Sequence, residues 1–444
     1  MTSPTTKDTR LRRALGLWDL VFYGIILIQP TAPMPVFGVV DQEARGHVAS
    51  TILIGMCAML FTAISYGRMA RAYPSAGSAY TYVGREIHSG LGFVTGWSMA
   101  MDYMLNPVIC TIWSSKAAMN IVPEIPYALW AVFFAALFTG LNLRGIRATA
   151  RTNEALVGAM CIVVAYFFVA AGRYLLHLPH VAWTQPFYDP ATFSWRAVST
   201  GTSIAVLTYI GFDGISTLSE EAHNPRRNIL LATVLTCLIT GVLATLEVYL
   251  GQLVWPDYRS FPDVDTAFVT VAGRAGGIVL FHVVNLTLLV ATIGSGSGAQ
   301  LGAARLLYGM GRDNTIPRGF FGAIEPKRRV PRNNVLFTGA LTLAGAFLMS
   351  YQLGAELLNF GAFIAFMGVN AAAFTRYFLR EREKKLVNFL PPVLGFLICG
   401  YIWLSLRTPA KIAGGSWLAL GILYTAFKTR GFRRAIEFAE PPPE

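Results

Sequence analysis

Long apolar runs, separated by short polar and basic segments, dominate this chain. Each run approaches the roughly 20 residues that an α-helix needs to cross a lipid bilayer. The pattern predicts an all-α membrane protein with twelve transmembrane helices between tails at residues 1–16 and 429–444. We place the spans at residues 17–40, 49–70, 91–119, 127–143, 153–175, 199–219, 230–254, 275–308, 335–350, 355–379, 388–406 and 415–428.

The first and sixth spans are interrupted in the middle. The first contains Gln29-Pro30-Thr31-Ala32-Pro33-Met34-Pro35, and the sixth contains Tyr209-Ile210-Gly211-Phe212-Asp213-Gly214. Proline inside a helix removes a hydrogen-bond donor and clashes with the preceding turn. In a membrane, such a break survives only where the freed backbone groups face protein or a water-filled cavity. Paired breaks therefore indicate the binding site of a secondary transporter. Kinks that serve only packing are the alternative.

The two broken spans lie five spans apart, and five is an odd number. Segments 17–175 and 199–379 therefore predict two five-helix units of opposite orientation, with a binding site between them near the middle of the membrane. This arrangement is a 5+5 inverted repeat that forms a transport core over residues 17–379. The two helices within residues 388–428 are additional to it.

Composition and charge agree with a membrane protein. Hydrophobic residues make up 54% of the chain and charged residues 14%, against roughly 25% charged in soluble domains. The net charge of +12 does not indicate nucleic-acid binding, because the basic residues lie between apolar runs. Of the 36 Lys and Arg residues, 28 lie in segments that a cytoplasmic N-terminus would place inside, so the positive-inside rule predicts two cytoplasmic termini. The eight on the outer side are Arg45, Lys116, Arg173, Arg196, Arg259, Arg274, Arg407 and Lys411.

The break in the first span offers the Gln29 amide, the Thr31 hydroxyl and freed backbone groups as ligands. Helix N-termini favour anions, and free carbonyl groups at helix C-termini favour cations. One unwound segment can therefore hold both ends of a zwitterion, or an ammonium group alone.

Two carboxylates fall in the middle of predicted spans, where a charge is costly and indicates function. Asp102 could pair with a substrate amine or accept a coupling proton, and Asp213 could bind a proton or satisfy the unwound backbone. Lys116 is four turns away on the same helix and is a poor partner for Asp102. Glu247 lies nearer the outer end of its span, where water can solvate it.

Other polar and aromatic positions have both a packing and a functional interpretation. Phe212 or Tyr209 could close over a ligand as an aromatic gate, or either could simply pack. The small residues around Ser295 and Ser297 allow close helix approach, while their hydroxyl groups could bind sodium. Asn359 has the same ambiguity.

Several functional classes are not supported by the sequence. It has no phosphate-binding Gly-x-x-x-x-Gly-Lys-Ser/Thr element, so we expect no ATP use and transport driven by an ion gradient. The six histidines are scattered, and the five cysteines lie in apolar runs, so we expect no metal site. No nucleophile–base–orienter set indicates an enzyme, and we expect no cofactor.

Three motifs resemble the amino acid–polyamine–organocation superfamily, most closely its bacterial putrescine importer branch. The likeness extends over about residues 10–430 and includes Phe61–Gly67 and Gly96-Trp97. The motifs are Ala72-Tyr73-Pro74-Ser75-Ala76-Gly77-Ser78-Ala79-Tyr80-Thr81-Tyr82, Gly211-Phe212-Asp213-Gly214-Ile215-Ser216-Thr217-Leu218-Ser219-Glu220-Glu221 followed by Asn224-Pro225-Arg226-Arg227-Asn228-Ile229, and Arg305-Leu306-Leu307-Tyr308-Gly309-Met310-Gly311-Arg312-Asp313.

The resemblance implies a LeuT-type fold of twelve helices in a bacterial inner membrane, with alternating access by rocking of one helix bundle. By position it implies coupling or gating roles for Asp102, Asp213, Phe212, Ser295 and Ser297. The implied substrate contacts are Gln29, Pro30, Thr31, Asp102, Tyr103, Leu207, Ile210, Gly211 and Phe212.

The chain departs from this superfamily at several positions. Some members couple protons through a lysine in the fifth span, where this chain has Met160. Others stack substrate on a tryptophan in the sixth span, where this chain has Leu207. Arg68 follows Gly67 where many members have an acidic residue. Asp102 replaces a small neutral residue of some amino-acid permeases, which favours a cationic amine as ligand.

These observations predict a multi-pass secondary transporter that imports a polyamine of the putrescine type, or an amino acid. Coupling to protons is expected, and sodium is the other candidate ion. The alternative is a neutral or cationic amino-acid permease or exchanger of the same superfamily. Besides this small molecule, membrane lipid is the only expected partner.

Overall fold

The computed structural model describes residues 15–73, 78–144, 150–218, 222–312, 316–325 and 330–428. Most of both predicted tails, the motif residues Pro74–Gly77 and Ser219–Glu221, and Asp313 lie outside the described residues. The regular secondary structure of the described part is helical, and one isolated β-bridge joins Leu15 and Ala222. The elements are α1 (Leu17–Ile28), α2 (Phe37–Glu43), α3 (Val48–Ala72), α4 (Ser78–Glu86), α5 (Ser89–Met119), α6 (Tyr127–Arg144), α7 (Ala150–Leu176), α8 (Trp195–Ala205), η1 (Val206–Tyr209), η2 (Phe212–Leu218), α9 (Pro225–Val254), α10 (Ala267–Arg312), α11 (Arg318–Phe321), α12 (Arg332–Leu348), α13 (Tyr351–Phe374), η3 (Thr375–Arg380), α14 (Leu386–Ser405) and α15 (Thr408–Lys428).

Within the described ranges, eight helices are long and apolar enough to cross a membrane. They are α3, α6, α7, α9, α10, α13 with η3, α14 and α15. The 31-residue α5, the 17-residue α12 and the two interrupted segments are not among these eight. Side chains on the outer surface are apolar, as at Ile162 and Leu423, which are 71% and 66% exposed. Such surfaces are suited to contact with lipid.

Both predicted breaks are present in the structure. The first span divides into α1 and α2, and Gln29 between them has a positive φ of 71°. The sixth span divides into α8, the 3₁₀ turn η1 and the 3₁₀ helix η2, with Gly211 at φ 123°. Neither segment is therefore a continuous α-helix.

Three other elements differ from the sequence prediction. The short helix α4 was not predicted. Helix α10 begins at Ala267, inside a segment predicted to be a loop, and Gly277 (φ 74°) interrupts its helical geometry near the start. Helix α15 begins at Thr408 rather than at residue 415. Gly273, Arg274, Gly276 and Gly277 interrupt the apolar pattern of α10 after its first turns, and Lys411, Gly414 and Gly415 interrupt that of α15, so a search for apolar runs starts both helices too late.

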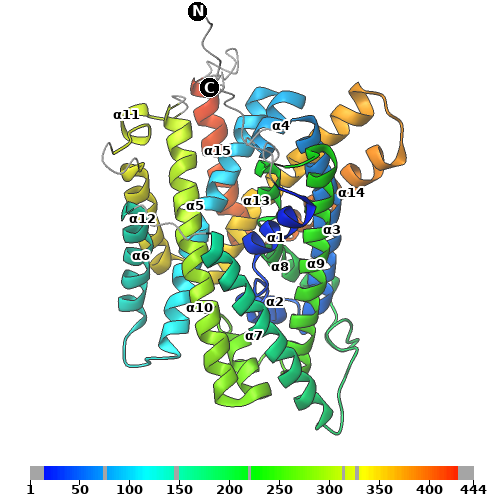
Figure 1. The fold of residues 1–444 in the computed structure, drawn as a ribbon, viewed down its shortest axis with the longest axis vertical. Helices are drawn as coiled ribbons and strands as arrows, with labels where there is room; N and C mark the ends of the chain where they lie inside the picture. Colours follow the sequence, from blue (N-terminus) through cyan, green and yellow to red (C-terminus); the bar gives the residue numbers. More distant parts are fainter. Residues whose placement is uncertain are drawn as a thin grey trace, which may run out of the picture.

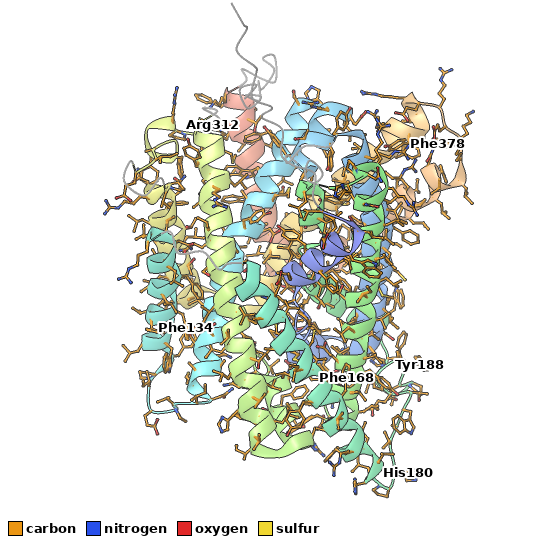
Figure 2. All side chains as sticks on the ribbon, viewed as in Figure 1. Phe134, Phe168, His180, Tyr188, Arg312 and Phe378 are labelled. Carbon is orange, nitrogen blue, oxygen red and sulfur yellow. The ribbon has the colours of Figure 1, made fainter. Side chains whose placement is uncertain are left out.

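The helices form one upright bundle (Figure 1). Helix α10 runs almost its full height, and α6 and α12 lie side by side at one edge. Helix α5 packs against α10 and α13, while α3 packs against α9. We call the end that carries α4 the α4 end, and the end that carries loop residues 177–194 the loop end. Figure 2 shows Arg312 at the α4 end and His180 at the loop end.

An ion cluster ties helices together at the α4 end. The side chain of Glu86 is fully buried and accepts hydrogen bonds from Arg376 (2.7 Å) and Arg380 (3.0 Å) of η3. The Tyr73 hydroxyl, just after α3, donates a third bond of 2.6 Å to it. Arg376 also lies over the Tyr73 ring, 5.0 Å from its centre. The cluster therefore joins α3, α4 and η3.

Glu86→Gln should lower the free energy of unfolding by about 3 kcal/mol, because it leaves two arginines without their buried counter-charge. Thermal unfolding of the purified protein in detergent measures the change. Glu383→Gln is the matched control: Glu383 is largely exposed, and its ion pair with Lys385 is 3.6 Å long. That substitution should cost less than about 1 kcal/mol. Equal effects of the two substitutions would contradict a stabilising role for the cluster.

Candidate functional site

The two breaks contact each other. A Cβ atom added to Gly211 would lie 3.3 Å from the carbonyl carbon and oxygen of Leu27, so the backbones of the two segments touch. Gly211 also has a positive φ, which only glycine adopts without strain. The glycine therefore permits both the unwinding of the sixth span and its close approach to the first.

Asn359 of α13 binds two backbone carbonyls at the end of α8, beside the second break. Its Nδ2 donates to the carbonyl oxygens of Ser203 (2.7 Å) and Ile204 (3.1 Å), in the last turn of α8. Asn359 is fully buried. Of the two interpretations that its sequence position left open, the structure shows a role in stabilising the broken helix.

The other break is fixed by side-chain and backbone contacts. Gln29 directs Nε2 toward the carbonyl oxygen of Ala291 in α10, at 3.5 Å. Thr31 is buried.

Around the second break, the backbone N–H groups of Gly211, Asp213 and Gly214 interact with the Asp213 carboxylate. Asp213 thus supports the unwound backbone of its own segment.

Asp102 on α5 lies within electrostatic range of Asp213. In the described part of the chain it has no hydrogen bond or ion pair, yet it is only partly exposed. The neighbouring Tyr103 is 37% exposed and packs against Gly302 of α10, 3.1 Å from the position of an added Cβ. Two carboxylates from α5 and η2 therefore face one region beside the breaks. A positive ligand is the natural counter-charge for such a pair.

Lys116 does not pair with Asp102, as expected. Its Nζ contacts Asp265 at 2.7 Å and Asp263 at 3.3 Å, so it ties α5 to the segment before α10. Asp102 is thus left without a cationic partner from its own helix.

Phe212, predicted to be a gate, is fully buried in an aromatic cluster. Its ring centre lies 5.5 Å from that of Tyr66 and 5.4 Å from that of Phe366. Tyr209, the other gate candidate, is also buried and donates its hydroxyl to the carbonyl of Ile52 (2.8 Å). Both rings therefore form packing contacts in this conformation.

Tyr66 is a residue of the site that the sequence analysis missed. It is fully buried, its hydroxyl has no hydrogen-bond partner among the described residues, and it interacts electrostatically with Asp213 and Asp102. Burying a hydroxyl group without a partner is costly. The sequence placed it in an apolar span and in the Phe61–Gly67 stretch of the family resemblance, but neither position distinguishes it from a packing tyrosine.

The two serines of α10 differ in their surroundings. Ser295 faces α5, where its hydroxyl lies 3.4 Å from Oδ1 of Asn106. Ser297 donates to the carbonyl of Ile293 in its own helix, at 2.8 Å. Between them, Gly296 allows Phe138 and Cys110 to approach closely. The stretch therefore serves close packing, and the structure does not bring Ser297 to the two breaks.

Two further carboxylates are buried without partners. Asp41 on α2 and Glu247 on α9 are both fully buried, and none of their four carboxylate oxygens accepts a hydrogen bond from a residue that the structure describes. The expectation that water solvates Glu247 is wrong, because its side chain is fully buried and lies within electrostatic range of Cys161 on α7. Asp41 lies one residue past the predicted end of the first span, so its sequence position did not indicate a carboxylate inside a span.

Aromatic side chains close the site toward the loop end. Phe37 of α2 makes edge contacts with Phe261 (5.8 Å between ring centres) and Phe268 (5.3 Å), and Phe167 of α7 packs on Phe268 at 4.8 Å. We call these four residues the aromatic seal. The aromatic seal joins α2, α7 and α10.

Sequence comparison identifies the family. The profile described as amino acid permease matches residues 42–426. The chain belongs to the amino acid permease family. This permease is a multi-pass membrane transporter and not an enzyme.

Individual relatives of the permease are similar along nearly their whole length. It is 34% identical to the low-affinity putrescine importer PlaP of Escherichia coli (strain K12), over 98% of this chain and 97% of that protein. Two Bacillus subtilis (strain 168) proteins match over 95% of this chain and 94% of their own length. They are the branched-chain amino acid permease BcaP (24% identical) and the methylthioribose transporter (27% identical).

Gly211→Ala should destabilise the permease by about 1–3 kcal/mol, because an L-residue is strained at this φ and its Cβ would press on the Leu27 carbonyl. The change appears as a lower midpoint of thermal unfolding. Gly172→Ala is the matched control: no atom lies within 4 Å of its added Cβ, and alanine favours the helix. A destabilisation no larger than that of Gly172→Ala would contradict the proposed contact between the breaks.

Proposed function

We propose that this permease is a secondary active importer of a polyamine of the putrescine class, driven by a proton gradient. The observation that carries the proposal is the unpaired Asp102 carboxylate, which lies within electrostatic range of Asp213 beside the two breaks. The full-length similarity to a putrescine importer supports the same substrate class.

A diamine suits this site by charge. An ammonium group donates a charge-assisted hydrogen bond to a carboxylate, and such bonds are roughly twice as strong as bonds between neutral groups. In our proposal one ammonium binds Asp102. The Gln29 side chain, Thr31, Leu207 and Ile210 surround the rest of the molecule, with Pro30, Tyr103, Gly211 and Phe212 completing the set.

The breaks offer few donors for a substrate carboxylate. Pro30, Pro33 and Pro35 have no N–H group, so the first break lacks three of its backbone donors. At the second break, the N–H groups of Gly211 and Gly214 already interact with Asp213. A ligand that carries ammonium groups and no carboxylate avoids this shortage.

The proposal includes the architecture of the transport core. We infer twelve spans in a LeuT-type fold, with segments 17–175 and 199–379 as inverted repeats and the helices of 388–428 added to them. The excess of basic residues at the α4 end supports cytoplasmic termini in a bacterial inner membrane. Under this orientation the aromatic seal faces outward, and rocking of the broken helices would open it.

Four carboxylates are candidates for the coupling proton. Asp102 and Asp213 lie at the site, and a bound cation could replace a proton there. Asp41 and Glu247 are buried without partners, a setting in which a carboxyl group is favoured in its neutral form. The hydroxyl groups of Ser295 and Ser297, the candidates for sodium, donate hydrogen bonds to Asn106 and to the Ile293 carbonyl, which leaves their oxygen lone pairs able to bind a cation. The proposed proton coupling therefore rests on the four carboxylates.

The second candidate is a neutral or cationic amino-acid permease or exchanger. The similarity to a branched-chain amino acid permease favours it. In that case the two breaks would hold the α-carboxylate and the α-amine of the substrate, and Asp102 would serve the proton. A competition assay that compares a diamine with an amino acid methyl ester distinguishes the two candidate functions, because the ester lacks the carboxylate that an amino-acid site would hold.

Asp102→Asn should reduce putrescine uptake at least about thirtyfold, since it removes the counter-charge of a partly buried ammonium group. Uptake of radiolabelled putrescine into proteoliposomes measures the loss. Asp257→Asn is the control, because Asp257 lies in an exposed loop-end segment. Unchanged uptake by a folded Asp102→Asn protein would exclude Asp102 as the ammonium ligand.

An inward proton gradient should stimulate putrescine uptake by the wild-type protein, and pooled amino acids should not compete. The measurement compares proteoliposomes with and without the gradient, and a sodium gradient serves as the parallel condition. Amino-acid exchange without putrescine uptake would instead establish the second candidate. Stimulation by sodium alone would overturn the proposed coupling ion.

A further inference from the structure

Two adjoining cavities lie between α8 and the corner where α14 meets α15. The first, of about 500 Å³, is lined by the basic residues Arg196, Arg407 and Lys411 and by several hydroxyl groups. The second, of about 420 Å³, is lined mainly by apolar side chains of α3 and α14, among them Leu53, Ile54 and Leu397. Neither cavity shares a residue with the breaks in the sixth span or with Asp102.

The two cavities form one amphipathic site. Trp195, Ser199 and Tyr401 line both of them, so the polar cavity continues directly into the apolar one. Ser199 and Tyr401 are joined by a hydrogen bond of 3.0 Å between their hydroxyl groups. Tryptophan and tyrosine are enriched where hydrocarbon meets headgroups. The shared residues therefore mark the boundary between a polar and an apolar compartment.

The position of the polar cavity is fixed at the membrane surface. Helices α14 and α15 both qualify as membrane spans, and only Leu406 and Arg407 separate them. So short a turn must lie at the membrane boundary. From Ser405 in the polar cavity, α14 runs about 12 Å toward the membrane interior to Leu397 in the apolar cavity.

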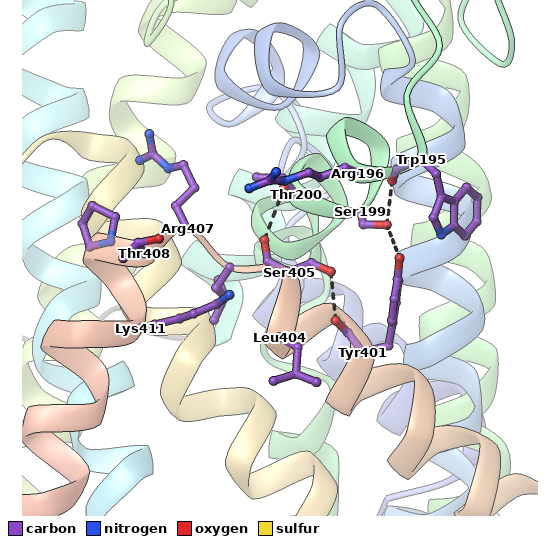
Figure 3. A pocket seen from close by; sticks show the side chains of 12 residues that line it. Trp195, Arg196, Ser199, Thr200, Tyr401, Leu404, Ser405, Arg407, Thr408 and Lys411 are labelled. Atoms are coloured by element: carbon purple, nitrogen blue, oxygen red, sulfur yellow. Dashed lines mark hydrogen bonds between the residues drawn. The ribbon is translucent and has the colours of Figure 1, made fainter.

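The charges in the polar cavity favour an anion. Arg407 is neutralised by the buried Glu356, at 2.7 Å. Arg196 and Lys411 have no ion pair with any residue that the structure describes, and Figure 3 shows both side chains extending into the space between α8 and the start of α15. Helices α8 and α15 also begin here, with their positive dipole ends at the cavity.

We propose that this site binds an anionic phospholipid, with its phosphate between Arg196 and Lys411 and an acyl chain in the apolar cavity. Phosphate matches the two free cations and the nearby hydroxyl donors. The apolar cavity opens beside exposed side chains of α14, such as Leu397, past which a lipid chain can enter from the bilayer. The inference requires only that the chain spans a membrane, and it is independent of the transported substrate.

Native mass spectrometry of the delipidated full-length protein tests the proposal. Phosphatidylglycerol and phosphatidylcholine with identical acyl chains are titrated separately. We expect one phosphatidylglycerol to be retained with at least about tenfold higher apparent affinity, because two unpaired cations attract its net charge. Equal retention of the two lipids would overturn the proposal, and this comparison needs no variant.

Substitutions then locate the site. Arg196→Gln with Lys411→Gln should remove the preference for phosphatidylglycerol. Arg173→Gln with Arg259→Gln, two exposed arginines elsewhere at the loop end, should keep it. An unchanged preference in the first pair would place the lipid elsewhere and overturn the assignment.

Two further experiments distinguish a bound lipid from other ligands of the site. Leu397→Trp, which fills the apolar cavity, should weaken phosphatidylglycerol binding at least about tenfold if an acyl chain lies there. Glycerol phosphate, which carries the phosphate without acyl chains, should not displace the lipid at equal concentration. Displacement by glycerol phosphate would show that a soluble phosphate compound occupies the site. Normal lipid binding by Leu397→Trp would overturn the placement of an acyl chain in the apolar cavity.

Discussion

The need to satisfy backbone polar groups away from water governs the centre of this permease. A broken helix leaves N–H and C=O groups free, and hydrocarbon offers them no partner. The chain meets this need with side chains that come from distant parts of the sequence. Asn359 binds two carbonyl groups of α8, Asp213 interacts with N–H groups of its own segment, and Gln29 reaches the backbone of α10. The unwound geometry exists because these partners exist.

Buried acidic residues fall into two groups according to what neutralises them. Near the ends of the bundle, Glu86 and Glu356 are held by arginines at 2.7 Å. Asp41 and Glu247 are equally buried but have no cationic partner in the described residues, and the partly exposed Asp102 has none either. A buried carboxylate without a partner must be protonated or must meet a charge that comes from outside the protein. The first group stabilises the fold, and the second contains the residues that we propose for substrate and proton binding.

The sequence was sufficient for features that depend on local chemistry. Three prolines in six residues and the glycines around Phe212 predicted both breaks, and apolar run lengths predicted most helices. The sequence could not reveal which long-range partners the breaks acquire. The hydrogen bonds of Asn359 and the unpaired hydroxyl of Tyr66 depend on packing between helices that are more than a hundred residues apart in the chain. Glu247 was misplaced because distance from the span centre does not reveal which helices cover a residue.

Helix α13, which continues into η3, connects two distant attachment points as one rigid element. Asn359 holds the broken end of α8, and Arg376, 17 residues later, holds Glu86 at the far end of the bundle. These two attachment points are about 26 Å apart along the helix axis. Tilting such a rod by about 5° displaces one attachment by about 2 Å relative to the other, which is more than a hydrogen bond tolerates. The break in the sixth span and the ion cluster therefore cannot move independently of each other.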